Sequence, residues 1–122
     1  MQEIFAKGQV LKKYPFIVRY LAYDFKDNHP LKVVVSVPKR RIKKATARNR
    51  VRRQIKEAYR LNKSNLIDEL RKADKGLALF FIYTGKENPE YSIIQEKIKL
   101  LLKDLEYICK SITIFLETKE TT

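Results

Sequence analysis

Three segments of the chain carry the apolar patterns of β-strands. Residues 15–21 alternate β-branched and aromatic side chains between two faces. Residues 33–37 are almost all β-branched, and the polar turn cluster at 27–30 predicts that these two strands form a hairpin. Residues 77–83 are apolar throughout, which predicts the central strand of the sheet.

A longer segment, residues 47–62, has the spacing of an amphipathic helix. Its apolar positions fall at i, i+4, i+7 and i+8 counted from Val51, so we expect this face to pack on the core. Projection at 100° per residue gathers cations and one amide on the opposite face. These residues are Asn49, Arg52, Arg53, Lys56 and Arg60, with Arg50 at the edge.

Two further helices are expected after this one. A short helix around residues 66–70 is expected to stop at Gly76. A longer helix is expected to begin at Asn88, because an Asn cap is followed by Pro and then by an acid in the first turn. Apolar residues then keep helical spacing over 94–109, and residues 111–122 fit a helix extension, an edge strand or a frayed end.

Length and composition favour a compact protein. With 122 residues, 44% of them hydrophobic, we expect residues 1–122 to form a single α/β domain with helices on one face of its sheet. The apolar run at 77–83 is too short to span a membrane, and residues 1–4 lack a signal-peptide pattern. We therefore expect no membrane partner, no export and a cytoplasmic location. One cysteine, Cys109, and one histidine exclude an internal disulfide and a Cys/His zinc site.

The charge is concentrated in one segment. The chain has 27 Lys and Arg against 14 Asp and Glu, a net charge of +13. Residues 39–60 hold eleven of the cations and one acid, Glu57, so this segment carries +10 and the other hundred residues carry +3. Like charges packed together repel one another, and so the cluster indicates an anionic partner.

Side chains for catalysis are scattered by comparison. The histidine, His29, lies in the expected turn, and the acids lie at helix ends or between lysines. The three glycines stand apart and form no phosphate-binding loop. We therefore predict no catalytic residue and no bound metal in this chain.

The phasing of the cations favours nucleic acid over a membrane surface as the partner. Arginine suits bidentate phosphate contacts, and Asn49 can hydrogen-bond a base edge or a sugar hydroxyl. A membrane-surface helix would carry bulkier apolar residues than Val51, Ile55 and Ala58. No leucine heptads follow Arg60, which excludes a leucine zipper but leaves DNA and RNA both open.

The basic segment closely resembles the signature of the bacterial ribonuclease P protein subunit. The matching residues are Ser36-Val37-Pro38-Lys39-Arg40 and Ala45-Thr46-Ala47-Arg48-Asn49-Arg50-Val51-Arg52-Arg53-Gln54-Ile55-Lys56-Glu57-Ala58-Tyr59-Arg60. Residues 5–8 look like the end of the family's first helix, 16–21 like its first long strand and 77–83 like its last strand. The resemblance therefore covers most of the chain.

This resemblance implies an α+β sandwich for the fold. The family has a small, mostly antiparallel sheet of about four strands with helices packed on one face. Its Arg-Asn-Arg helix belongs to a left-handed crossover, which is an exception to the usual right-handed rule.

The resemblance also implies a function. In that family the catalytic centre is an RNA subunit that uses Mg²⁺, and the protein helps it to bind precursor tRNA and remove the 5′ leader. The expected partners are thus the catalytic RNA and precursor tRNA, with Mg²⁺ mainly on the RNA and no protein partner required. The residues expected to bind RNA are Lys39, Arg40, Arg41, Arg48, Asn49, Arg50, Arg52, Arg53, Lys56 and Arg60.

A cleft between the sheet and a helix is expected to receive the leader. The candidates for its floor, where bases can stack on rings, are Phe5, Phe16, Val18 and Tyr20, for which a plain core role is the alternative.

The chain departs from the family pattern in three ways: a shorter first helix, Pro38 in place of the usual serine, and a longer loop to Arg48 without the usual glycine. The runner-up function is a ribosomal or general RNA-binding module without processing activity.

Overall fold

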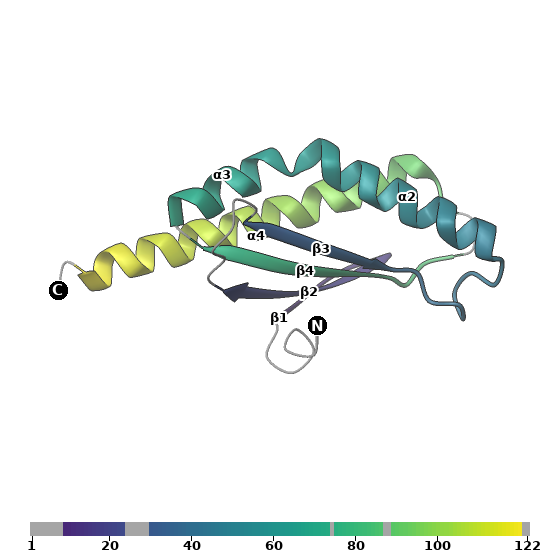
Figure 1. The fold of residues 1–122 in the computed structure, drawn as a ribbon, viewed down its shortest axis with the longest axis horizontal. Helices are drawn as coiled ribbons and strands as arrows, with labels where there is room; N and C mark the ends of the chain where they lie inside the picture. Colours follow the sequence, from purple (N-terminus) through teal and green to yellow (C-terminus); the bar gives the residue numbers. More distant parts are fainter. Residues whose placement is uncertain (1–8, 24–29, 74, 87–88, 121–122) are drawn as a thin grey trace.

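The computed structural model describes residues 9–23, 30–73, 75–86 and 89–120, and it describes their side chains except at 22, 23, 73 and 111–120. Its elements follow one another in the order β-β-β-α-α-β-α (Figure 1). They are β1 (Gln9–Lys13), β2 (Phe16–Tyr23), β3 (Leu31–Ser36), α2 (Ala45–Asn62), α3 (Ser64–Ala73), β4 (Gly76–Tyr83) and α4 (Tyr91–Glu120). The fold is therefore α+β, as the family resemblance implied.

The four strands form one open sheet in the order β1-β2-β4-β3. β1 pairs antiparallel with β2, β2 pairs antiparallel with β4, and β3 pairs parallel with β4. The sheet is thus mostly antiparallel, and the apolar strand at 77–83 is central, both as predicted. The predicted hairpin between residues 15–21 and 33–37 is wrong, because β4 lies between β2 and β3 and takes the hydrogen bonds of both.

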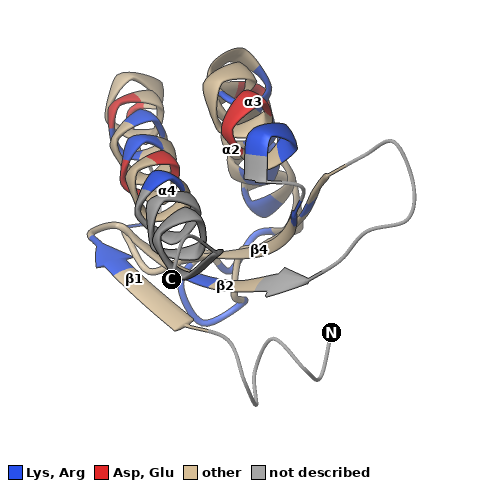
Figure 2. Ribbon diagram, turned by 90° about the vertical axis from the view of Figure 1, so that its left-hand side faces the viewer, with Lys and Arg blue, Asp and Glu red and all other residues tan. Residues whose placement is uncertain are grey.

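The three helices of the described residues lie on one face of the sheet, as predicted, with α4 over the β1 side and α2 and α3 over the β3 side (Figure 2). The chain leaves β3, runs back through α2 and α3 and enters β4 parallel to β3. Seen from the helix side with both strands pointing upward, β4 lies to the left of β3 (Figures 1 and 2). This crossover is therefore left-handed.

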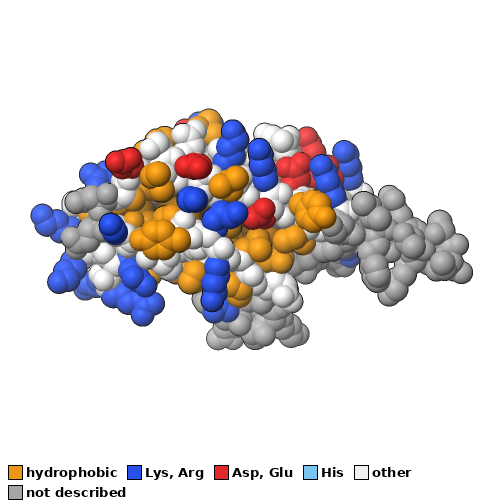
Figure 3. Space-filling model, turned by 180° about the vertical axis from the view of Figure 1, so that it is seen from behind, with side chains coloured by type: hydrophobic (Ala, Val, Ile, Leu, Met, Phe, Trp, Pro, Cys, Tyr) orange, Lys and Arg blue, Asp and Glu red, His pale blue; other side chains and the backbone are white. Residues whose placement is uncertain are grey.

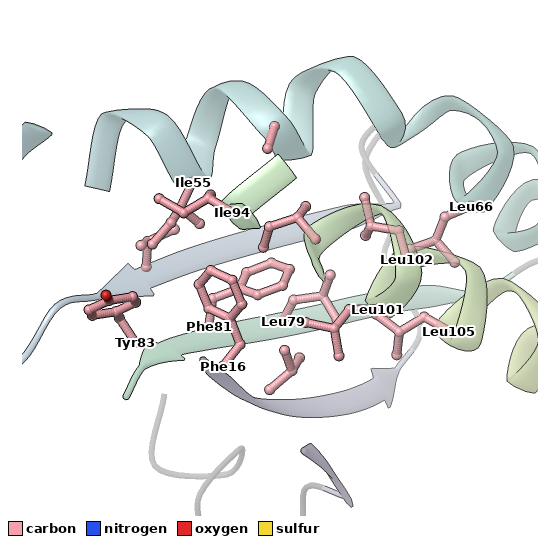
Figure 4. Close-up of a cluster of buried hydrophobic side chains, with 14 of the residues drawn as sticks. Phe16, Ile55, Leu66, Leu79, Phe81, Tyr83, Ile94, Leu101, Leu102 and Leu105 are labelled. Carbon is pink, nitrogen blue, oxygen red and sulfur yellow. The ribbon is translucent and has the colours of Figure 1, made fainter. Parts of the chain in front are cut away.

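The core fills the space between the sheet and the helices. The apolar stripe predicted for α2 is buried, with Val51, Ile55 and Ala58 at 0% exposure. They belong to the same buried cluster as residues of β4 and α4, and Figure 4 shows Ile55 of α2 beside Ile94 of α4. Burial of this stripe fixes the rotation of α2 about its axis, so the polar side of the helix must face solvent.

Some predicted boundaries differ from the structure. Gly76 begins β4 instead of stopping a helix, and α3 ends earlier, where the amide of Lys75 donates to the carbonyl of Leu70 at 3.1 Å. Residues 111–120 continue α4, the first of the three predicted options for this tail. The predicted cap Asn88 and the helix end expected at residues 5–8 lie outside the described residues.

Candidate RNA interface

The exposed side of α2 carries the predicted cations. Because Val51, Ile55 and Ala58 face the core, the side chains on the other side of the helix meet solvent. Arg52 is half-buried, and the others are exposed: Asn49, Arg50, Arg53, Lys56 and Arg60. A shallow groove of about 400 Å³ runs along this side, lined by Asn49, Arg52, Arg53, Lys56, Glu57 and Arg60. We call this surface the basic groove.

Hydrogen bonds within the basic groove hold two of its arginines in place. Arg52 Nη1 donates to Asn49 Oδ1 at 2.8 Å. Arg60 donates to both carboxylate oxygens of Glu57, from Nε at 3.1 Å and from Nη2 at 2.6 Å. The hydrogen bond from Arg60 lowers the pKa of Glu57 below its ordinary value, so this carboxylate is ionised at neutral pH. One negative charge thus lies within the row of cations.

The start of α2 adds to the positive potential. Its N-cap, Lys44, makes no side-chain capping bond, and the first turn holds no acid. The amide groups at a helix N-terminus carry a partial positive charge that attracts phosphate. This end of the helix therefore adds to the attraction that the basic groove has for an anion.

The loop between β3 and α2 leads to the same end of the helix (Figure 1), and it carries further cations. The amides of Arg41 and Ile42 both donate to the carbonyl of Pro38, at 3.0 and 3.3 Å. Ile42 is 1% exposed and anchors the turn in the core. The neighbouring cations are exposed, namely Lys39, Arg40, Arg41, Lys43 and Lys44.

Tyr59 of α2 packs against the sheet. Its ring centroid lies 6.4 Å from that of Phe81 in a tilted arrangement, and Lys63 Nζ lies 5.7 Å from the Tyr59 centroid. Burial raises the pKa of Tyr59 to about 12, so its hydroxyl stays protonated at neutral pH. The aromatic residue near the end of the basic segment is therefore a support for the helix.

The structure separates the predicted leader-binding residues. Phe16 and Val18 point into the core under the helices and are 1% and 0% exposed, so in this conformation neither can meet a base. This burial is the core role that the sequence left as the alternative. Tyr20 is half-buried and packs against the same core, and Phe5 lies outside the described residues.

The opposite face of the sheet carries a row of side chains that sequence reasoning missed. Cross-strand pairing aligns Val10, Arg19, Phe80 and Val34 across all four strands. Phe80 is half-buried, and Val10 and Val34 are exposed. In the described part of the chain all helices lie on the other side of the sheet (Figure 1). The alternation in residues 15–21 contained this signal, since every second residue must face away from Phe16 and Val18.

The rest of the surface is mixed in charge. On the rear face, where α4 lies, acidic and basic side chains are interspersed with hydrophobic ones (Figure 3). Among the described residues, no group of three or more His, Cys, Asp or Glu side chains is placed to hold a metal ion. Within that same part of the chain, the helices lack the length and apolar character needed to cross a membrane.

Comparisons with known proteins agree on one family. The family model described as Ribonuclease P matches residues 1–106. A ribonuclease P protein component of Porphyromonas gingivalis is 31% identical over 96 residues, 79% of this chain and 70% of that protein. The RNase P protein of Thermotoga maritima has a TM-score of 0.67 at 25% identity, covering 84% of this chain and 88% of the other. The Staphylococcus aureus RNase P protein shares the fold, with a TM-score of 0.63 at 22% identity and 84% of each chain covered.

Proposed function

The chain belongs to the ribonuclease P protein family, and from this premise we propose how it helps to remove the 5′ leader of precursor tRNA. It is an RNA-binding subunit of ribonuclease P and takes part in tRNA processing. The proposal assigns cleavage to the RNA subunit and the binding of two RNA molecules to this chain. Its support is the chemistry of the basic groove, because guanidinium and ammonium groups neutralise phosphates but do not act as nucleophiles or bases at neutral pH.

The RNA subunit binds to the basic groove and to the loop that precedes α2. The observation that carries this assignment is the row of exposed cations along one side of a helix whose other side is fully buried. Asn49 lies within that row and can bond to a base edge or a ribose hydroxyl. Each cation that meets a phosphate releases a counterion, so the affinity falls with salt.

The leader of precursor tRNA lies on the open face of the sheet. Phe80 offers a ring for base stacking, and Arg19 and Val34 stand beside it in register. Stacking on an aromatic ring tolerates any base, and a nearby cation meets the backbone of the single strand. This assignment replaces the core residues Phe16 and Val18 as the surface that the leader contacts.

Magnesium ions act mainly on the RNA subunit in this proposal. Phosphates that approach each other in the folded RNA repel, and the cations of this chain neutralise part of that charge. The complex therefore needs less Mg²⁺ than the RNA alone. No second protein takes part, and the complex works in the cytoplasm.

Reconstitution from two components tests the proposal. Ribonuclease P RNA is incubated with precursor tRNA at low Mg²⁺, with and without the purified chain. We expect leader removal only when the chain is present, and rates that become similar at high Mg²⁺. A general RNA-binding module would bind the RNA without restoring cleavage at low Mg²⁺, and that result would overturn the proposal.

The leader assignment has its own test. Phe80→Leu keeps the open face apolar but removes the ring. Tyr107→Leu is the control, because it removes a ring that is 73% exposed on α4. Stacking of one base contributes a free energy that corresponds to roughly a 5- to 150-fold change in affinity. We expect Phe80→Leu to weaken binding of precursor tRNA to the complex at the low end of this range. Mature tRNA, which lacks the leader, should bind equally to both variants, and an equal loss for mature tRNA would contradict the assignment.

A further inference from the structure

The first arginine of the Arg-Asn-Arg motif points back into its own chain. Arg48 Nη1 donates to two successive backbone carbonyls, that of Ile42 at 2.9 Å and that of Lys43 at 2.7 Å. These carbonyls belong to the loop between β3 and α2. A charged donor makes stronger hydrogen bonds than a neutral one, and here a single nitrogen holds two neighbouring peptide groups.

The same loop is fixed at two other points. The turn at Pro38 accepts the amides of Arg41 and Ile42, and the Ile42 side chain is buried in the core. Among the described residues, the segment between Ile42 and the start of α2 is otherwise held by the helix itself, through the amide of Arg48, which donates to the carbonyl of Lys44 at 3.0 Å. The Arg48 guanidinium thus ties the end of the loop to the first turns of α2.

We propose that Arg48 is a positioning residue, which fixes the loop so that its cations and the basic groove meet the RNA together. This inference rests on the proposed function, in which the loop and α2 bind the RNA subunit. Ordering a flexible segment during binding costs conformational entropy, and a loop that is already ordered in the free protein avoids that cost. The cations that depend on this order are Lys39, Arg40, Arg41, Lys43 and Lys44.

Arg53 supplies a matched control on the same helix. It is exposed in the basic groove, and within the described part of the chain it makes no hydrogen bond or ion pair with another residue. Arg48→Met and Arg53→Met each remove one positive charge and keep a side chain of similar length. The two variants therefore remove the same charge, but only Arg48→Met removes hydrogen bonds to the loop carbonyls.

Hydrogen exchange in the free protein is the first test, and it needs no RNA. In Arg48→Met we expect the amides of Arg41 and Ile42 to exchange roughly tenfold faster, as the loss of hydrogen bonds to a charged group predicts. The same amides should be unchanged in Arg53→Met. The amide of Phe81 in the central strand reports global stability and should be unchanged in both. Unchanged exchange at Arg41 and Ile42 in Arg48→Met would overturn the proposal.

Binding of ribonuclease P RNA is the second test. Both Met variants are made in the full chain and in a background where Lys39, Arg40 and Arg41 are all alanine. Arg48→Met should weaken binding about fivefold more in the full chain than in this background, because the background lacks three of the five loop cations that Arg48 positions. Arg53→Met should weaken RNA binding by the same factor in the full chain and in the alanine background. An equal loss for Arg48→Met in both would mean that Arg48 contacts phosphate directly and would overturn the proposal.

The two tests separate this inference from the proposed function. If the unmodified chain fails to bind the RNA, the proposed function is wrong, and the role of Arg48 in RNA binding is overturned with it. The exchange result would still decide whether Arg48 holds the loop.

Discussion

Replacing Glu57 by glutamine should tighten RNA binding. Glu57 is the one acid among eleven cations in residues 39–60, and it lies in the basic groove with both oxygens on Arg60. Glu57→Gln keeps the size of the side chain and removes its charge. Both residues of this pair are well exposed, so we expect little change in stability.

The magnitude follows from the geometry of the pair. Because Arg60 Nη2 lies 2.6 Å from Glu57 Oε1, a phosphate on Arg60 would come within about 4 Å of the carboxylate. In water, two unit charges at that distance change an equilibrium constant by about fivefold. At 0.1 M salt the screening length is about 10 Å, so most of this repulsion remains. We therefore expect about fivefold tighter binding of Glu57→Gln to ribonuclease P RNA.

The assay is the dissociation constant measured across a salt series. If Arg60 gains a phosphate contact, the slope of log K against log salt should steepen by about 0.7 to 0.9. Because Arg60 lowers the pKa of Glu57, the gain should be constant at neutral pH. It should shrink as the pH falls through that lowered pKa, where the unmodified chain also becomes neutral at this position.

A variant on the other side of the molecule is the control. Glu106→Gln removes the same charge from a pair on α4, where Glu106 Oε1 lies 3.4 Å from Lys110 Nζ. We expect it to leave binding unchanged. Weaker or unchanged binding of Glu57→Gln would refute the reasoning, since it would mean that Glu57 holds Arg60 in the orientation the RNA needs or that Arg60 meets no phosphate.

Three further predictions concern the fold. Leu101 is 0% exposed in the core, so Leu101→Ala should lower the free energy of unfolding, measured in urea melts, by about 2 to 5 kcal/mol. Leu61 is 51% exposed, and Leu61→Ala should change the same free energy by less than about 0.5 kcal/mol. Gly85→Ala should lower the melting temperature, because a Cβ there would lie 2.7 Å from that of Pro15, and an unchanged melting temperature would contradict this packing. Burial raises the pKa of the Cys109 thiol to about 11, so iodoacetamide should modify this thiol at pH 8 only after unfolding. Because the thiol ionises at about pH 8.5 in the unfolded chain but only near 11 in the folded one, the free energy of unfolding should fall as the pH rises from about 8.5 towards 11.

The sequence predicted the layers of the fold better than the pairing of its strands. Periodicity identifies the buried side of an element, and α2 is buried along the stripe that its spacing predicted. Pairing depends on distant partners, and here the strand at 77–83 enters between the two that a local turn signal had joined. β1 was missed because its side chains are mostly polar or exposed, which is common in an edge strand.

The candidate site was predicted in part for a similar reason. The exposure of Arg53, Lys56 and Arg60 follows from helical phase alone. Alternation placed Phe16 and Val18 on one face together but could not tell which face of the sheet the helices cover. The contacts of Arg48 depend on the path of a loop, and no pattern in the sequence encodes that path.

The RNA that accompanies the chain in its own cells tests the central claim most directly. The tagged chain is purified at moderate salt, and its bound RNA is sequenced beside that of a variant with Arg53, Lys56 and Arg60 changed to alanine. We predict one predominant structured RNA of the ribonuclease P type with the unmodified chain and its depletion with the variant. Recovery of ribosomal RNA or of a random mixture would contradict the account.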